Sequence, residues 1–144
     1  MRLWRIANYA DLSGQGGKFS AGRWNFLGTP MVYCADHPAT ALVEILVHVD
    51  AEDLPLTYQL LEIEVPDKAK PAVPTLSSNW QDDLNETRQI GTNFIAAGNT
   101  PVLEVPTVVV PFARNYLLNP MLLDQHGIRV AGVTTHPFDA RLLG

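Results

Sequence analysis

The residues best suited to chemistry in this sequence are an arginine, a tyrosine and a glutamate that fall within residues 21–48. Arg23 lies in a glycine-flanked polar turn, Tyr33 in a short apolar run, and Glu44 near the middle of an apolar-periodic segment. A guanidinium group binds two phosphate oxygens at once, which suits a pyrophosphate. A tyrosine ring can stack on a flat ligand. These residue types therefore allow a site for a phosphate-bearing ligand that also carries a flat ring.

Each of these residues also has a structural explanation, which the local pattern favours when the residue is considered alone. Arg23 could stack on Trp24, and Tyr33 could be a core tyrosine whose hydroxyl has a hydrogen-bond partner. Glu44 and His48 could form an acid–base pair four residues apart. The surrounding periodicity instead favours a solvent-facing polar edge of an amphipathic helix. A functional interpretation therefore depends on whether the chain brings the three residues together.

Four further residues are candidates on weaker patterns. Asn25 shares the polar turn of Arg23, where backbone N–H groups and the guanidinium could face one ligand. Arg5 lies in a strand-like segment and could be a solvated edge charge or a pocket residue. Thr107 could hydrogen-bond a ligand, although threonine is also a common strand residue. Cys34 is better explained as a buried apolar side chain than as a nucleophile.

Tyr33 and Glu44 must be positioned by two neighbouring elements. Residues 31–35 are too short for a helix, contain β-branched and aromatic residues and are bounded by turn residues, so we predict a strand. Apolar residues recur at helical spacing over residues 39–49, which predicts an amphipathic helix with Glu44 on its polar side. The start of this helix is marked by a capping side chain and an early proline, Asp36 and Pro38.

The rest of the chain mixes strands and helices without strict βαβ alternation, which favours an α+β domain. Further strands are predicted over residues 3–7, 57–65, 102–110 and 128–134. A slip in the alternation of residues 57–65 predicts a bulge, or burial on both faces. Residues 108–110 lack polar alternation and are expected in a central, doubly covered strand. One helix, or two broken near Gly91, is predicted within residues 80–97.

The connections between these elements are predicted from their turn residues. Residues 8–19 are expected to form a mobile loop, residues 66–74 an exposed proline-rich connection, and residues 115–120 a turn-like segment. No repeat and no linker divides the chain, so residues 1–144 are predicted to form a single domain.

The composition restricts the class of partner and the compartment. The 144 residues are 47% hydrophobic and 17% charged, which is typical of a globular domain. The net charge of -5 argues against nucleic acid as a direct partner, because such binding needs clustered lysine and arginine. The histidines are scattered and no HExxH or CxxC spacing occurs, so no metal site is expected. No signal-peptide pattern, no membrane-length apolar run and one cysteine predict a cytoplasmic protein without membrane contact.

Five segments carry a combined pattern that is more specific than any single residue: LWRI, AGRWNFLGTPMVYCA, ALVEILVH, PTVVVPFARNYLLNP and FDARL. Together they resemble the RES-domain toxins of bacterial RES–Xre toxin–antitoxin systems, over nearly the whole chain. That family is named for an arginine, a glutamate and a serine. Arg23 and Glu44 match the first two, and Tyr33 matches an active-site tyrosine. Thr107 occupies the serine position, and its added methyl group favours a positioning role over a nucleophilic one.

The resemblance implies an ADP-ribosyltransferase-like fold with twisted mixed or antiparallel β-sheets and flanking helices. It implies the toxin of a type II toxin–antitoxin system that cleaves the nicotinamide–ribose bond of NAD, by hydrolysis or phosphorolysis, and so arrests growth. NAD would be the substrate, with no cofactor and no metal. An Xre-type helix-turn-helix antitoxin would be the partner, and a homodimer is a further option. The implied catalytic residues are Glu44, Arg23 and Tyr33, with Arg23, Tyr33, Asn25, Thr107 and Arg5 binding substrate.

The residue types fit this chemistry. Cleavage leaves an oxocarbenium-like ribose, which the Glu44 carboxylate can stabilise, while Tyr33 stacks on nicotinamide and Arg23 holds the pyrophosphate. Two alternatives stay open: an ADP-ribosyltransferase that acts on a protein target, and a non-catalytic nucleotide-binding module with a regulatory role. An RNA-cleaving toxin is disfavoured by the acidic charge and the lack of a basic, aromatic-rich face.

Overall fold

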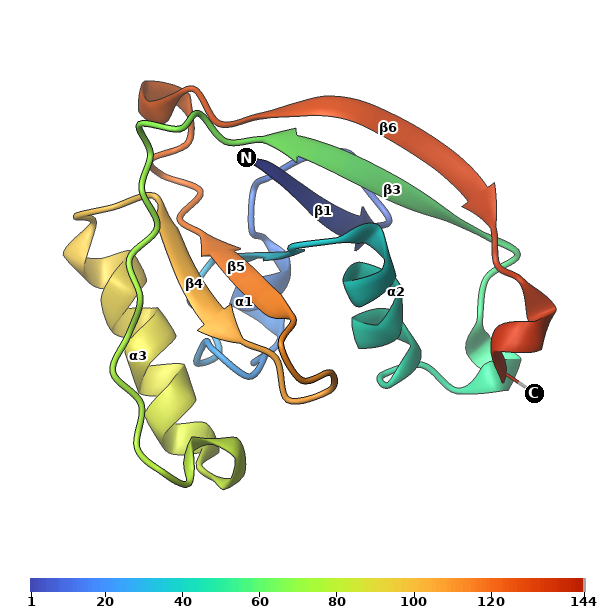
Figure 1. Cartoon of the computed structure of the whole chain (residues 1–144), viewed down its shortest axis with the longest axis horizontal. Coiled ribbons are helices and arrows are strands. Elements are labelled where there is room, and N and C mark those ends of the chain that lie inside the picture. Colours follow the sequence, from blue (N-terminus) through green and yellow to red (C-terminus); the bar gives the residue numbers. More distant parts are fainter. Residues whose placement is uncertain (144) are drawn as a thin grey trace.

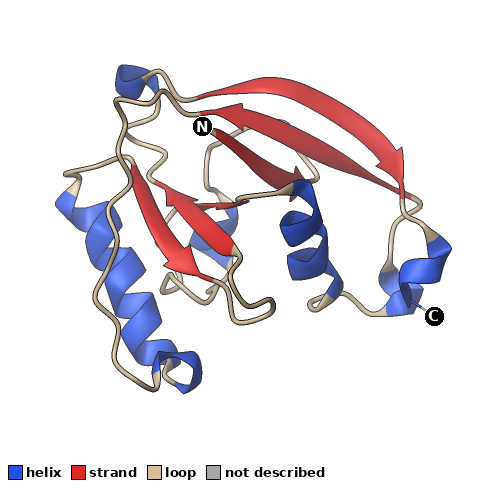
Figure 2. Ribbon diagram, in the orientation of Figure 1, coloured by secondary structure: helices blue, strands red, loops and turns tan. Residues whose placement is uncertain are grey.

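The computed structural model describes residues 1–143, and an antiparallel six-stranded sheet forms its centre (Figures 1 and 2). Helices flank this sheet, which confirms the predicted α+β class. In spatial order the strands are β4 (Val102–Pro106), β5 (Arg114–Leu118), β2 (Val32–Ala35), β1 (Arg2–Ala7), β3 (Thr57–Glu64) and β6 (Arg129–Pro137). The α-helices are α1 (Gly16–Phe19), α2 (Pro38–Leu46) and α3 (Leu84–Ala97). Short 3-10 helices cover Ala51–Asp53, Trp80–Asp82, Asp124–His126 and Ala140–Leu143.

The sheet consists of two three-stranded halves that are joined weakly in the middle. β4, β5 and β2 pair over most of their lengths, and so do β1, β3 and β6. Between the halves, the ladder of β1 and β2 contains one residue pair within the described chain, Trp4 with Ala35. The strands therefore diverge on either side of this pair, and Figure 1 shows β4 and β5 running at a different angle from β3 and β6.

Local sequence signals explain where α2 and α3 begin and end. Pro38 opens α2, where its missing N–H costs no hydrogen bond. Asp83 caps α3 by accepting a hydrogen bond from the backbone N–H of Glu86 at 3.0 Å. Gly98 ends α3 in the left-handed conformation, with φ 61°, which glycine adopts without a Cβ penalty. These signals fix α3 as one continuous helix that carries Gly91 in its interior.

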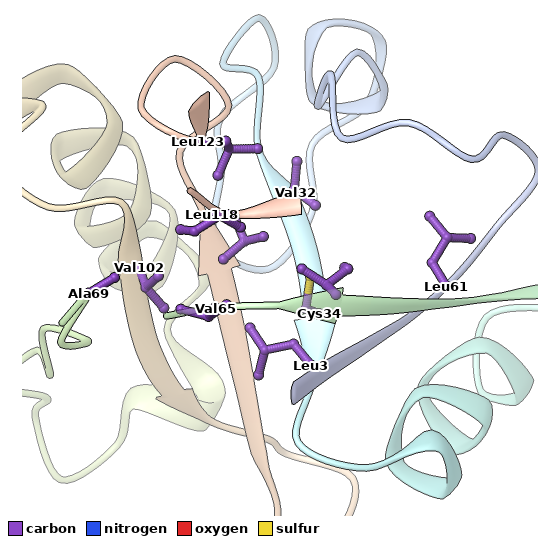
Figure 3. Packing of buried hydrophobic residues seen from close by; sticks show 11 residues of the cluster. Leu3, Val32, Cys34, Leu61, Val65, Ala69, Val102, Leu118 and Leu123 are labelled. Carbon is purple, nitrogen blue, oxygen red and sulfur yellow. The ribbon is translucent and has the colours of Figure 1, made fainter. Parts of the chain in front are cut away.

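Two hydrophobic clusters hold the helices and the sheet together. The larger one joins β1, β2, β3, β4 and β5, and Figure 3 shows its side chains meeting between the two halves of the sheet. It contains Leu3, Val32, Cys34, Leu61, Ile63, Val65, Ala69, Val102, Leu118, Leu123 and Ile128. The second cluster packs α3 and the segment after Arg23 against β4 and β5, through Trp24, Met31, Phe94, Leu103, Val105 and Leu117. Cys34 is buried, as its apolar interpretation predicted.

The structure corrects the prediction for residues 102–120 in two places. The strand β4 ends at Pro106, and Val108–Val110 form bends, with Val108 45% exposed, rather than a doubly covered strand. Residues 115–120, predicted as turn-like, contain most of β5, which pairs with both β2 and β4. The tertiary pairing overrides the turn preference of the asparagine and proline residues in this segment.

Smaller corrections concern the ends and connections of elements. The cap of α2 is His37, whose Nδ1 accepts a hydrogen bond from Ala39 N, rather than Asp36. The predicted loop 8–19 contains the short helix α1, and Ala69 in the connection 66–74 is buried. The irregularity in β3 falls between Glu62 and Ile63, opposite β6. None of the helices in residues 1–143 has the length and apolarity that a membrane crossing requires.

Candidate active site

A cavity of about 520 Å³ lies beside the junction of the two half-sheets, within the size range of small-molecule sites. Its walls come from β1, β2, α2, the turn around Arg23, the start of α3 and the segment after β4. Arg23, Tyr33 and Glu44 all line it, although they come from a loop, a strand and a helix. The divergence of β1 from β2 leaves this space beside the sheet, so the fold itself creates the cavity.

The turn that carries Arg23 is fastened to one face of α3. Thr87 Oγ1 donates a hydrogen bond to the carbonyl oxygen of Arg23 at 2.6 Å. The backbone N–H of Phe26 donates to Thr92 Oγ1 at 3.1 Å. Gly91 lies between these contacts, and a Cβ atom there would lie 1.7 Å from the carbonyl oxygen of Trp24. Glycine therefore allows the close approach that places the Arg23 guanidinium at the cavity.

The guanidinium of Arg23 reaches over an exposed region at the edge of the cavity. Its Nη1 donates to the carbonyl oxygen of Gln81 at 3.2 Å. The neighbouring Trp24 is 2% exposed and packs on Trp80, with ring centroids 6.1 Å apart. Trp24 thus belongs to the core beneath the turn, and the remaining donors of Arg23 are available to a ligand in the cavity.

Tyr33 presents its ring to the cavity while its hydroxyl is fully engaged. The hydroxyl donates to Asn25 Oδ1 at 2.5 Å and accepts from the backbone N–H of Trp24 at 3.1 Å. Burial raises the pKa of Tyr33 to about 12, so the hydroxyl remains a proton donor at neutral pH. Asn25 Oδ1 also accepts from the backbone N–H of Gly22 at 2.9 Å. The pair of Tyr33 and Asn25 therefore fixes the turn that carries Arg23.

Asn25 lies beneath the cavity rather than in its lining. The side chain is 1% exposed, and its Nδ2 donates to surrounding backbone carbonyls, including that of Ser20 at 3.2 Å. In this place Asn25 shapes the turn and does not reach a ligand in the cavity. Its predicted contact with substrate would therefore be indirect, through Tyr33 and the turn.

Glu44 points into the cavity from α2, and two side chains from β5 and from the segment after β4 hold its carboxylate. Thr107 Oγ1 donates to Glu44 Oε1 at 2.5 Å, and Asn115 Nδ2 donates to the same oxygen at 3.0 Å. Among the described residues no donor reaches the other oxygen, Oε2. The solvent-facing interpretation of Glu44 was wrong, because its side chain is half-buried and accepts hydrogen bonds from Thr107 and Asn115. His48 stays exposed at the cavity mouth.

Arg5 and Cys34 line the floor of the cavity. Arg5 Nη1 donates to the carbonyl oxygen of Tyr33 at 2.9 Å, which adds a bond between the diverging strands β1 and β2. Its Nε is buried and has no hydrogen-bond partner within residues 1–143. Burial raises the pKa of the Cys34 thiol to about 12, so the reactive thiolate is absent at neutral pH.

The charges that line the cavity oppose the charge of the chain as a whole. The chain has a net charge of -5, but three arginines line this cavity, Arg5, Arg23 and Arg88, against one carboxylate, Glu44. The four salt bridges found within the described residues involve none of these arginines. Such a cavity favours an anionic ligand, because focused positive charge in a cleft attracts it. No group of three or more potential metal-binding side chains occurs in residues 1–143.

Sequence reasoning missed two residues of this site. Arg88 lies on α3 and donates through Nε to the carbonyl oxygen of Gly22 at 2.8 Å. Asn115 lies on β5, which was predicted as a turn. The spacing of Thr87, Gly91 and Thr92 is a signal for a close helix contact, and it would have placed Arg88 on the same face.

Comparison with known proteins assigns a family to this arrangement. The RES domain family matches residues 2–139. A protein named "Toxin Res" from Pseudomonas putida is 45% identical over 123 residues, covering 83% of this chain and 85% of that protein. A protein named "Prs ADP-ribosylating toxin" from a Sphingobium species is 38% identical over 154 residues, covering 98% of this chain and 96% of that protein. The structure also resembles a chain of the M. tuberculosis MbcT–MbcA toxin–antitoxin complex, with a TM-score of 0.72 and 17% identity over 99% of this chain and 86% of that chain.

Proposed function

The chain belongs to the RES-domain family of toxins, and from that premise we propose that it degrades NAD by cleaving the nicotinamide–ribose bond. One observation carries the proposal: a carboxylate whose Oε2 accepts no hydrogen bond from residues 1–143 faces a cavity that three guanidinium groups line. This charge pattern matches NAD, which carries an anionic pyrophosphate and develops positive charge on the ribose during cleavage. The cytoplasmic pool of NAD would be the target.

The binding roles follow from where the side chains lie. Arg23, at the exposed edge, would bind the pyrophosphate through the donors that Gln81 does not use. The ring of Tyr33 would stack on the nicotinamide, since its hydroxyl is held to one side by Asn25 and Trp24. Together these contacts would place the scissile bond opposite Glu44.

Glu44 would act on the ribose through Oε2. Its other oxygen is held by Thr107 and Asn115, so the carboxylate is fixed before substrate arrives. A carboxylate that needs no reorganisation stabilises the oxocarbenium-like transition state more strongly than a mobile one. When the C1′–N bond breaks, its electron pair passes to the positively charged nicotinamide nitrogen, so neutral nicotinamide leaves without a general acid.

The acceptor then completes the reaction. Water attacks C1′ and loses a proton, giving ADP-ribose, or a phosphate oxygen attacks and gives ADP-ribose 1″-phosphate. A protein nucleophile is the alternative acceptor, and the name of the Sphingobium relative, "Prs ADP-ribosylating toxin", supports this second candidate. All three outcomes share the same first step at Glu44.

A neutralising partner belongs to this proposal. Continuous loss of NAD would stop growth, so a cell that makes this chain needs an inhibitor. The similar fold comes from a toxin–antitoxin complex, which supports a protein antitoxin here. We propose an Xre-type helix-turn-helix protein in this role, and co-expression should restore growth if it binds.

The test is a time course of purified protein with NAD, with and without inorganic phosphate, and with added bacterial protein extract. The proposal expects nicotinamide release in all three, and the accompanying product identifies the acceptor: ADP-ribose, its 1″-phosphate, or modified protein. A non-catalytic regulatory module would bind NAD and leave it intact. Nicotinamide release only with protein extract would favour the protein-modifying candidate.

A further inference from the structure

Arg88, on α3 next to the Arg23 turn, has no role in the family resemblance, yet it lines the same cavity as Arg23. We propose that Arg88 binds one phosphate of the pyrophosphate while Arg23 binds the other. This pair makes the site specific for a dinucleotide over a mononucleotide. The inference rests on the proposed function, because it concerns how that site recognises NAD.

The backbone under both arginines is held in a fixed arrangement. Arg88 Nε donates to the carbonyl oxygen of Gly22, the residue before Arg23, at 2.8 Å. Thr87, the residue before Arg88, donates to the carbonyl oxygen of Arg23 at 2.6 Å. These two neighbouring hydrogen bonds join two consecutive residues of the turn, Gly22 and Arg23, to two consecutive residues of α3. They hold the turn against the start of α3, so that both arginines line the same cavity.

The Arg88 guanidinium has N–H donors that no protein group uses within residues 1–143. A guanidinium has five N–H donors, of which four are on the two Nη nitrogens. In Arg88 the Nε donor is used on Gly22, and within residues 1–143 the Nη nitrogens make no hydrogen bond. The side chain is half-buried, so its direction is fixed by the Nε contact while its outer edge stays open. That edge matches the paired acceptor oxygens of one phosphate group.

The electrostatics also favour an anion near these residues. Two guanidinium groups in one cavity repel each other, and none of the described ion pairs supplies a carboxylate to either one. Glu44 is engaged with Thr107 and Asn115 instead. A pyrophosphate carries one negative charge on each of its two phosphates, so each guanidinium can bind its own phosphate group. A mononucleotide carries about the same charge on a single phosphate and offers no second phosphate group to the other arginine.

The experiment compares ligands with two phosphates and with one, in a background that prevents turnover. Affinities for NAD and for nicotinamide mononucleotide would be measured by calorimetry on Glu44→Gln, and on Glu44→Gln combined with Arg88→Gln. Loss of charge-assisted hydrogen bonds should weaken NAD binding about 10- to 100-fold, with less than about a threefold effect on the mononucleotide. Arg129→Gln makes the same chemical change on β6, outside the cavity lining, and should alter neither affinity.

Three outcomes would overturn the inference. The first is an equal loss of affinity for both ligands, which would show that Arg88 does not distinguish two phosphates from one. The others are unchanged NAD binding in the Arg88 variant and absence of NAD binding to Glu44→Gln. If Arg88→Gln unfolds the turn, Arg88→Lys keeps the cation without the planar fork and should give a smaller loss for NAD alone. Wild-type protein that leaves NAD intact, with the affinity split present, would reject the enzyme function and retain the Arg88 assignment.

Discussion

Thr107 donates its hydroxyl hydrogen to Glu44 Oε1 across 2.5 Å, although 63 residues separate the two in the chain. The same hydroxyl oxygen accepts a hydrogen bond from the backbone N–H of Val109 at 3.0 Å. The hydroxyl is therefore held at both its proton and one lone pair, which fixes its position against the carboxylate. Asn115 completes the arrangement from β5 by donating to the same carboxylate oxygen. The orientation of Glu44 thus depends on two elements that are remote in sequence.

Thr107→Ser should retain NAD turnover within about threefold, whereas Thr107→Val should lower kcat roughly 10- to 100-fold, because a misplaced catalytic group can cost about 100-fold. Serine keeps the donor to Glu44, and valine keeps the shape without it. Steady-state kinetics with melting temperatures would measure both effects. Equal activity of the serine and valine variants would show that this hydrogen bond does not position the carboxylate.

Gly91→Ala should destabilise the protein, since the new Cβ would lie 1.7 Å from the carbonyl oxygen of Trp24. Alanine gains about 1 kcal/mol in helix propensity, but overpacking costs about 1–3 kcal/mol and here meets backbone. The clash dominates, and it displaces the turn that carries Arg23, so NAD binding should fall together with the melting temperature.

The matched control is Gly16→Ala in α1, where a Cβ atom meets nothing within 4 Å. This variant should melt at or slightly above the wild-type temperature. A Gly91→Ala protein as stable as Gly16→Ala would mean that α3 does not rest on the Arg23 turn as described.

The variants Tyr33→Phe and Tyr33→Leu should distinguish the contribution of the Tyr33 hydroxyl from that of its ring. Phenylalanine leaves the N–H of Trp24 without its acceptor, which costs about 1–3 kcal/mol of stability, but it keeps the surface for stacking. Leucine removes the ring as well and should raise KM for NAD. Kinetics and urea unfolding would test this pair, and loss of turnover in Tyr33→Phe at unchanged stability would instead assign chemistry to the hydroxyl.

The free energy of unfolding should fall at alkaline pH. Burial raises the pKa of Cys34 from 9.0 to about 12 and that of Tyr33 from 10.0 to about 12. For Tyr116, burial and then the hydrogen bond to Glu104 raise the pKa to about 12. Because the folded pKa values exceed the unfolded ones, this stability is complete below about pH 9 and is lost as pH rises towards 12.

The urea midpoint between pH 8 and 11.5 measures this loss. Cys34→Ala should move its onset from about pH 9 to about pH 10, where the tyrosines begin to titrate in the unfolded chain. A midpoint that stays constant up to pH 11 in the wild type would contradict the assigned burial of these three groups.

The sequence predicted the elements around the Arg23–Glu44 segment well and the segment after β4 poorly. The segments of β2 and α2 have a clear pattern of apolar residues and are flanked by turn and capping residues, so their type and order were predictable. Residues 115–120 were predicted as turn-like, but pairing on both sides makes residues 115–118 part of β5, and the Asn115 amide donates to Glu44. Val108–Val110 have strand propensity but form bends, because β4 ends at Pro106, and Val108 and Val109 line the cavity.

The residues that line the cavity also fall into two groups, those that the sequence predicted and those that it did not. Arg23, Tyr33 and Glu44 could be selected from their types and from the family resemblance, and the structure brings them to one cavity. Arg88 and Asn115 could not, because each reaches its partner across more than 60 residues and through a helix or strand register that the local pattern does not contain. Long-range geometry, rather than residue type, defines these two.

Nicotinamide release by wild-type protein and by Glu44→Gln, at NAD concentrations that saturate both, tests the central claim most directly. Glutamine keeps the shape and can still hydrogen-bond Thr107, so folding and NAD affinity should be nearly unchanged. Without the negative charge opposite the ribose, the rate should fall at least about 100-fold, the usual cost of removing a transition-state electrostatic contact. Equal rates for the two proteins, or intact NAD with both, would contradict the account.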